Sequence, residues 1–250
     1  MKNLILGLAL LCCVTGYTQI LNAESLRKVT DTSGWSGSAS VNFALRGGVN
    51  DYIAFGSDIH VQYKMKTHLI LIKNQLNFQK VDDDRFGNSG IQHVRYNNRF
   101  HDRWSWEVFA QAQYNKVSKI DFRGLVGLGP RFKVTRYENY KVYVGALIMY
   151  EQEELDDGFT PIQRDFRFSS YLSFSFYPKD GMSLISTSYY QPKVDRFADH
   201  RFSNESTLKI DLFKNLGFSA TYVFIFDAFP AIGVPNSQYR FRTGLTYSFD

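Results

Sequence analysis

The sequence predicts an all-β protein, an antiparallel up-and-down transmembrane β-barrel of about 12 strands. Three observations predict this fold. Apolar and polar residues alternate along most of the chain, the connections alternate between short and long, and aromatic residues recur near both ends of the alternating stretches. Of the 250 residues, 21% are charged and 16% are aromatic. This composition disfavours a helical membrane protein and favours strands.

The first residues have the pattern of a secretory signal peptide. A short basic start, Met1 to Asn3, precedes an apolar run that is too short to cross a membrane as a helix. Small residues then precede an expected cut after residue 18, and Ala23 offers a second cut. We therefore expect a signal peptide at 1–18, a periplasmic N-terminal segment at 24–33, and an outer-membrane β-barrel at 34–250.

Both cysteines of the chain, Cys12 and Cys13, lie in the expected signal peptide. A lipidated cysteine is an alternative, but Leu11 stands before Cys12 where a small residue is expected. The mature chain is therefore expected to lack cysteine, which leaves it without disulfides or thiol chemistry.

Strand-like stretches follow one another from residue 34 to the end of the chain. In "DRWSWEVFAQAQYNK" (102–116), Trp104, Trp106 and Val108 share one face and Glu107 shares the other with Gln111. A period of two predicts a strand with one apolar and one polar face. Most stretches reach the ~9–11 residues that a tilted strand needs to cross a bilayer. The expected strands are 34–46, 51–65, 68–80, 91–101, 103–116, 120–136, 139–152, 164–178, 182–191, 202–214, 217–228 and 238–249.

The connections between these strands differ in length. The links after even strands are tight, as in "KT", "HD", "YEN", "KDG" and "KN". Several links after odd strands are longer: "VDDDRFGNSG", "EELDDGFTPIQR", "QPKVDRFADH" and "DAFPAIGVPNSQ". Outer-membrane barrels combine short periplasmic turns with long outside loops, and an even strand number places both chain ends in the periplasm.

Aromatic residues are expected to form belts at the two membrane interfaces, with smaller aliphatic residues between them. The candidates for the belts are Trp35, Trp104, Trp106, Tyr140, Phe176 and Phe249.

The polar faces of the strands carry too many charges for a dry core, because unpaired buried charges are costly. Two interpretations stay open: a water-filled lumen whose positive excess favours anions, or a narrow interior packed with mutually paired charges. Phe109 on the polar side favours packing. The candidates for lumen-facing charges are Arg46, Asp58, Lys64, Arg95, Arg99, Glu107, Arg123, Arg131, Arg167, Asp211, Arg240 and Arg242.

The sequence offers little for catalysis or cofactor binding. In "DHRFSNES", His200 and Ser203 are three residues apart, so a strand would point them to opposite faces. The five histidines have no metal-ligand spacing. Acidic runs at 82–84 and 153–157 could hold calcium or bridge ions to lipopolysaccharide, but solvated loop charge is the simpler reading. We expect no catalytic residues, no cofactor, no metal and no nucleic-acid partner.

Three motifs carry a family resemblance over most of the chain: Gly34-Trp35-Ser36-Gly37, Asp102-Arg103-Trp104 and Gly127-Leu128-Gly129-Pro130-Arg131. With them the chain resembles the DUF481 family, which contains the salt-induced outer-membrane proteins. It departs from that pattern in the first hairpin, where "GGVND" stands in place of a Gly-Asn-Thr-type turn. The resemblance implies an outer-membrane β-barrel and no established biochemistry.

The combined expectation is a non-enzymatic envelope protein in the outer membrane of a Gram-negative bacterium. It would be related to salt or osmotic stress, or form a narrow, porin-like pore for small ions. The alternatives are an outer-membrane lipid-modifying enzyme and a protein that binds partners through its surface loops. Expected partners are outer-membrane lipid, lipopolysaccharide and the barrel-assembly machinery. The sequence leaves the oligomeric state open.

Overall fold

The computed structural model describes residues 33–46, 52–81, 85–135, 137 and 139–249. The expected signal peptide, its alternative cut after Ala23 and almost all of the expected 24–33 segment lie outside these residues. In the described part of the chain, no helix is both long and apolar enough to cross a membrane.

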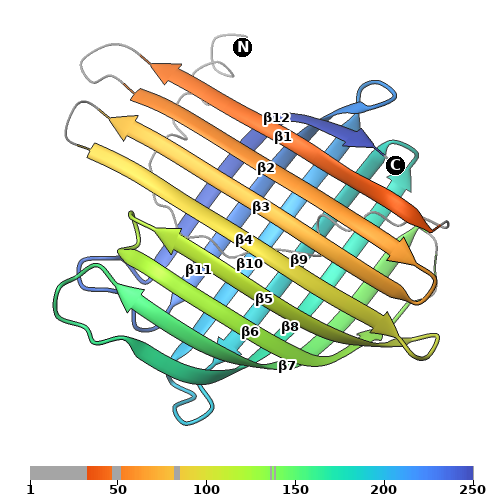
Figure 1. The fold of residues 1–250 in the computed structure, drawn as a ribbon. Coiled ribbons are helices and arrows are strands. Elements are labelled where there is room, and N and C mark those ends of the chain that lie inside the picture. The colour runs from red at the N-terminus through yellow and green to blue at the C-terminus, as the bar shows by residue number, and fades with distance from the viewer. Residues whose placement is uncertain (1–32, 47–51, 82–84, 136, 138, 250) are drawn as a thin grey trace, which may run out of the picture.

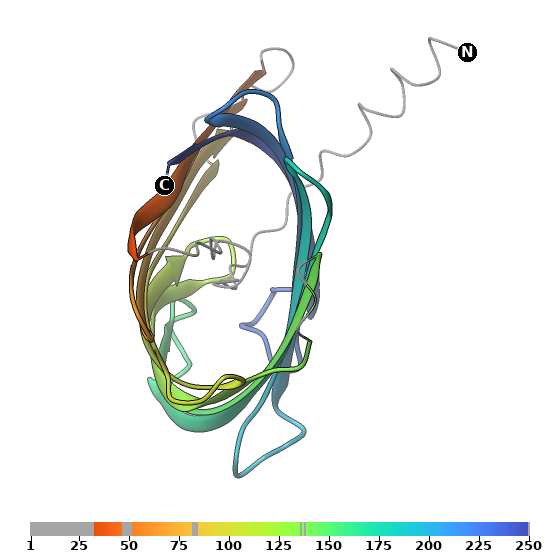
Figure 2. The same ribbon diagram turned by 90° about the vertical axis from the view of Figure 1, so that its right-hand side faces the viewer.

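The described residues form twelve antiparallel strands in one closed barrel, which confirms the predicted fold class (Figure 1). Each strand pairs with its neighbours in sequence, and β1 closes the barrel against β12. Viewed toward one end, the barrel has an elongated outline (Figure 2). The strands are β1 (Gly34–Arg46), β2 (Tyr52–Met65), β3 (His68–Val81), β4 (Arg85–Arg99), β5 (Trp104–Asn115), β6 (Ile120–Lys133), β7 (Tyr140–Leu155), β8 (Gln163–Lys179), β9 (Met182–Pro192), β10 (His200–Asp211), β11 (Leu216–Asp227) and β12 (Ser237–Phe249).

The strand order is as expected, but the predicted contrast in loop length is only partly present. β4 begins at Arg85 instead of 91, so most of the long link expected before it belongs to the strand. β7 likewise continues to Leu155 and takes up the start of another expected loop. Links 156–162, 193–199 and 228–236 are longer than the turns at 180–181 and 212–215, whereas link 134–139 exceeds 116–119. Polar residues beside a strand can extend its hydrogen-bond ladder, which composition alone does not reveal.

Side chains alternate between the inner and outer walls of the barrel. In β5, Trp106 is 48% exposed on the outside, whereas Glu107 and Phe109 are 0% and 7% exposed on the inside. The outer wall is apolar on every side. Exposed examples include Val41, Phe55, Ile72, Val94, Val126, Leu128, Leu172, Phe174 and Leu245.

The candidate belt aromatics lie on this outer wall, at the end of the barrel that carries the short turns. Trp35, Trp104, Trp106, Phe176 and Phe249 are exposed, and Tyr140 is half-buried. Neighbouring strands place further rings beside them, with centroid distances of 4.8 Å for Trp35–Tyr63 and 4.7 Å for Trp104–Phe132. An exposed ring of this kind suits the interface between lipid and water.

The outer wall predicts how an arginine will affect stability in lipid. Val126 lies midway along β6 and is 55% exposed. We expect Val126→Arg to lower the free energy of unfolding in phospholipid vesicles by about 2–4 kcal/mol, because a charge at the bilayer midplane is desolvated. Val134→Arg, just beyond the end of β6, is the matched control and should cost about 0–1 kcal/mol. Equal losses in urea unfolding would contradict the orientation of this wall.

Candidate functional site

The candidate site is the interior of the barrel, which has two parts. Inward side chains of β3 to β10 are mostly buried against one another, and we call this part the sealed half. Inward side chains of β11, β12, β1 and β2 are mostly small or polar, and many are half-exposed. We call these half-exposed residues the polar strip; they are Ser40, Asn42, Asp58, Ser219, Thr221, Arg240, Arg242, Gly244 and Ser248.

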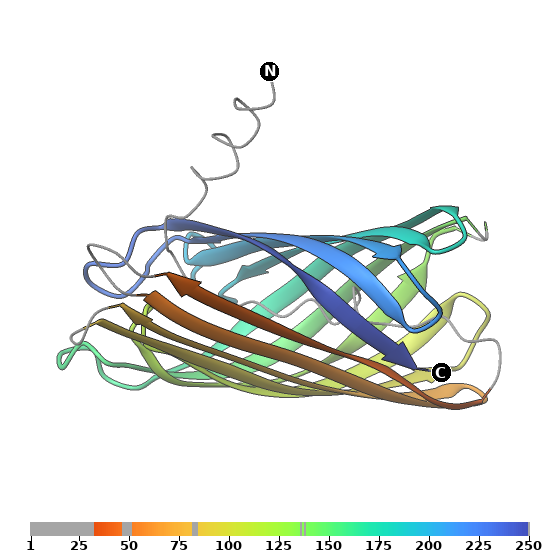
Figure 3. The same ribbon diagram turned by 90° about the horizontal axis from the view of Figure 1, so that it is seen from above.

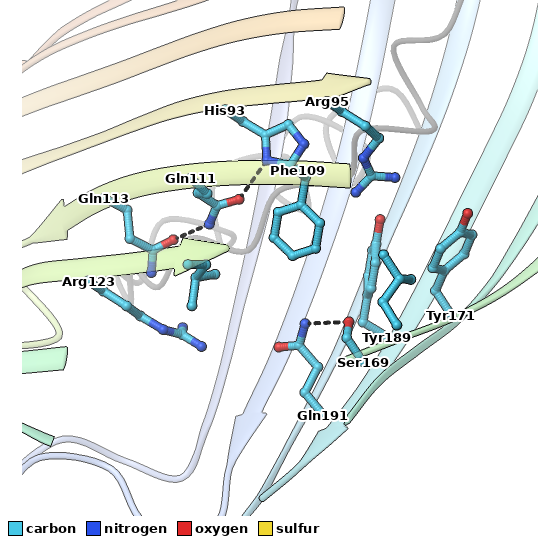
Figure 4. Close-up of a pocket in the computed structure, with 12 residues that line it drawn as sticks. His93, Arg95, Phe109, Gln111, Gln113, Arg123, Ser169, Tyr171, Tyr189 and Gln191 are labelled. Carbon is cyan, nitrogen blue, oxygen red and sulfur yellow. Dashed lines mark hydrogen bonds between the residues drawn. The ribbon is translucent and has the colours of Figure 1, made fainter. Parts of the chain in front are cut away.

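An apolar cluster fills the middle of the sealed half. Phe109 and Tyr189 point into the same space from different strands (Figure 4). The cluster consists of Phe109, Leu125, Leu147, Met149, Tyr171 and Tyr189, which come from β5 to β9. Because these strands lie on different sides of the interior, the cluster joins their walls and leaves little room for solute.

Glycines on the inner wall make room for the large rings of this cluster. A Cβ atom at Gly127 would collide with the ring of Phe109, and one at Gly145 would collide with the ring of Tyr171. Both glycines lie in the middle of a strand, where glycine is otherwise unfavourable. The ring of Tyr171 therefore occupies the inner surface of β7 where a side chain would stand.

Glu107 joins the cluster to a polar group nearer the short turns. The Tyr171 hydroxyl donates a 2.7 Å hydrogen bond to its Oε2, which links β5 to β8. Asn97 donates a second hydrogen bond to Oε1. The guanidinium groups of Arg95 and Arg131 lie 3.6 and 3.7 Å from the carboxylate. The fully buried carboxylate thus has charged and neutral donors around it, as a buried charge requires.

A second charged group centres on Glu151 in β7, nearer the long-loop end. Arg123 Nε donates to Oε2 at 2.8 Å, Arg167 Nε to Oε1 at 3.0 Å, and Arg201 Nη1 to Oε1 at 2.7 Å. The three arginines come from β6, β8 and β10. One carboxylate therefore connects strands on different sides of the interior.

This group continues on both sides as one ion-pair network. Arg201 also pairs with Glu153 at 2.8 Å and with Asp227 at 2.7 Å. Arg167 pairs with Asp199 at 2.9 Å, and Lys193 bridges Asp199 and Asp165. Partial burial disfavours the charged form of Lys193, but its hydrogen bonds to Asp165 and Asp199 outweigh that effect and raise its pKa.

The cavities of the sealed half are small. One, beside Phe109, has a volume of about 30 Å³, and another, between Arg201 and the 228–236 link, has about 40 Å³. Each has room for about two or three water molecules. The ion-pair network and the apolar cluster leave little free volume around these two cavities.

The predicted lumen charges fall into four groups. The structure brings Arg95 and Arg131 to Glu107, and Arg123 and Arg167 to Glu151, all buried inside the barrel. Inside the barrel but half-exposed are Asp58, Lys64, Arg240 and Arg242, and Asp58 pairs with Lys73 at 3.1 Å. Arg99 and Asp211 are exposed at the short-turn end, so their expected place in the lumen is wrong. Arg46 ends β1, and its side chain lies outside the described residues.

Arg99 and Asp211 have the inward parity of their strands but lie at the last positions of β4 and β10. There the opposite walls no longer enclose a side chain, which parity alone does not reveal.

Sequence reasoning missed several residues of the interior. Leu125 and Met149 are apolar, but each lies two residues from a charged inward residue of its strand, Arg123 or Glu151. That two-residue spacing could have placed them inside the barrel. Glu153 fell in an expected loop and Arg201 just before an expected strand, yet both extend the alternation of their strands.

The histidine and serine of "DHRFSNES" lie on opposite faces of β10. His200 packs outside against Tyr190 and Phe226, with ring centroids 5.5 Å apart in each case, whereas Ser203 is buried inside. They therefore cannot act as a nucleophile and its base. Among the described residues, no group of three or more His, Cys, Asp or Glu side chains could hold a metal ion.

The acidic runs also differ from expectation. Residues 82–84 lie outside the described part of the chain. Glu153 and Glu154 belong to β7 instead of a loop, and Glu153 faces inward toward Arg201. Asp157 does lie in the loop, where the Thr160 hydroxyl and the backbone amides of Thr160 and Phe159 donate to its carboxylate and lower its pKa.

The fold is similar to that of solved outer-membrane porins and channels. The COG4313 outer membrane channel from Pseudomonas putida F1 is similar with a TM-score of 0.56 and 9% identity, covering 92% of this chain and 100% of its own. The NanC porin is similar with a TM-score of 0.53 and 11% identity, covering 86% and 100%. At these identities the likeness concerns the fold alone.

The chain belongs to the family described as "Protein of unknown function, DUF481", whose sequence profile matches residues 28–249. This confirms the family resemblance. No curated protein matches the chain.

The network around Glu151 predicts a large loss on removing its charge. We expect Glu151→Gln to lower the free energy of unfolding by about 3–5 kcal/mol, because three buried arginines lose their shared counter-ion. Glu154→Gln, exposed on the outer face of the same strand, should leave urea unfolding unchanged. Similar curves for the two variants would show that the network does not stabilise the barrel.

The contact between Gly145 and Tyr171 predicts an energetic coupling. Gly145→Ala should cost about 1–3 kcal/mol, because the added methyl group displaces the ring. Tyr171→Leu removes that ring, so the loss in the double variant should be smaller than the sum of the single losses. A double-mutant cycle from unfolding curves measures the coupling, and strict additivity would rule out the contact.

Proposed function

We propose that the protein is a non-enzymatic barrel of the Gram-negative outer membrane that conducts small ions along the polar strip. The apolar outer wall, the aromatic belt and the expected signal peptide support the location, as does the likeness in fold to outer-membrane channels. Lipid and lipopolysaccharide are then the partners of the outer wall.

The single observation that carries the proposal is the contrast between the two parts of the interior. In the sealed half, apolar and paired charged groups exclude solute. Along the polar strip, Ser40, Thr221 and Ser248 have short side chains, and their half-exposure shows space beside them. On β12 the half-exposed inward residues run from Arg240 to Gly244, and Ser248 follows beyond the buried Thr246. Conduction would therefore follow one side of the lumen instead of its axis.

The charges of the strip favour anions. Arg240 and Arg242 stand on β12, and the inward face of β10 carries the half-buried Lys209 and the buried Glu205, which leaves a positive excess. Asp58, the acidic residue of the strip, pairs with Lys73. A positively lined constriction lowers the energy of an anion inside it and raises that of a cation.

Conductance in planar bilayers tests this function. We expect small, steady currents in potassium chloride and a reversal potential that indicates chloride selectivity in a salt gradient. Arg240→Gln combined with Arg242→Gln should shift the reversal potential toward cation selectivity, because two positive charges leave the strip. Absence of current in every salt would disprove conduction.

A blocking variant separates the strip from the rest of the barrel. Ser40→Trp should reduce the current severalfold, because its side chain would fill the strip from the half-exposed inner face of β1. Gly124→Trp, on the outer face of β6, is the matched control and should leave the current unchanged. Equal currents through both variants would place the path elsewhere.

A further inference from the structure

The junction between the first and last strands is paired over only part of its length. Among the described residues, β1 and β12 pair at five positions, from Gly37 with Phe249 to Val41 with Leu245. Beyond Val41, residues 42–46 pair with β2 alone, and residues 237–244 pair with β11 alone. The two strands meet near the short turns and diverge toward the long loops (Figure 3). We call these two facing strand edges the open seam.

The open seam covers most of the depth of one leaflet of a membrane. At about 3.3 Å per residue, the five residues of β1 span roughly 16 Å along the strand, and a tilt of about 40° makes this roughly 12 Å of depth. Half of a hydrocarbon core of about 30 Å is about 15 Å. The seam therefore opens the lumen sideways toward the leaflet on the long-loop side.

The sequence of the two strands opposes closure of the seam. Continuing the existing register would place Arg46 opposite Arg240, and like charges directly opposite each other are destabilising. At the point of divergence, the Asn42 side chain lies so close to Gly244 that a Cβ atom there would collide with its Oδ1. Divergence therefore begins where a side chain occupies the space between the strands.

The open seam is apolar outside and positively charged inside. Phe43 and Leu45 are each 65% exposed, and Tyr239 and Phe241 are 61% and 59% exposed. On the inner side, Arg240 and Arg242 are half-exposed. An occupant with a polar anionic head and an apolar chain would satisfy both sides.

We propose that the open seam binds one anionic amphiphile, with its chain between Phe43, Leu45, Tyr239 and Phe241 and its headgroup against Arg240 and Arg242. The charge of these arginines selects an anion, and the apolar outer residues select a chain. The site goes beyond ion conduction, because its ligand arrives from the membrane side of the barrel.

Binding to the purified protein in dodecyl maltoside micelles tests the site. Isothermal titration with dodecyl phosphate should give one site per barrel, and inorganic phosphate at the same concentration should give no heat. Arg240→Gln combined with Arg242→Gln should weaken binding at least tenfold, whereas the exposed Arg99→Gln at the other end should not. Equal binding of dodecyl trimethylammonium, or undiminished binding by the double variant, would overturn the proposal.

Cysteine pairs test whether the seam is open. Ser38→Cys with Ser248→Cys joins paired positions and should form a disulfide rapidly. Leu45→Cys with Phe241→Cys would be opposite only in a closed seam, so it should oxidise at least tenfold more slowly, and dodecyl phosphate should slow it further. Equal rates would overturn the proposal.

The two functions fail independently. A barrel that conducts but binds no dodecyl phosphate keeps the ion path and loses the lateral site. A barrel that binds one dodecyl phosphate but carries no current keeps the lateral site and loses the ion path.

Discussion

Pairing of charges inside a narrow barrel is the constraint on which the rest of the structure depends. The two-residue period of a strand sends every second side chain inward, so charges on that face must find partners across the interior. Glu107 and Glu151 each form ion pairs with arginines from several strands. Their contacts bring distant walls together, and the apolar cluster between them packs in the space that remains. The packed interpretation holds for the sealed half. The open interpretation stays a prediction for the polar strip.

The uneven interior gives the barrel two kinds of wall. The sealed half holds large side chains over Gly127 and Gly145, so strength comes from contacts across the lumen. The polar strip combines short side chains with Arg240 and Arg242 near the junction of β1 and β12. In the proposed function, rigidity and ion passage would belong to different strands.

The fold could be predicted from the sequence because period two, strand length and outward apolar residues all report the same membrane environment. Parity also placed Arg123, Glu107 and Arg167 correctly inside. The ends of strands are harder to predict than their faces. The sequence therefore predicts longer loops beside β4 and β7 than the structure has. It also predicts a lumen position for Arg99, which is exposed at the end of β4. For β9 the sequence does not indicate which face points inward, because serines and tyrosines suit either wall. In the structure, Tyr189 points inward and Tyr190 outward.

Partners across the lumen were beyond sequence reasoning, because they depend on which strands face each other after closure. The contact of Arg201 with Glu151 joins residues 50 apart in the chain. Such distance has a consequence for the order of assembly. Before β10 is in place, Glu151 already has Arg123 and Arg167, but Glu153 has Arg123 alone, 3.5 Å away. The arrival of Arg201 therefore completes the compensation of both carboxylates, and a chain inserted strand by strand would gain this stability late, in a single step.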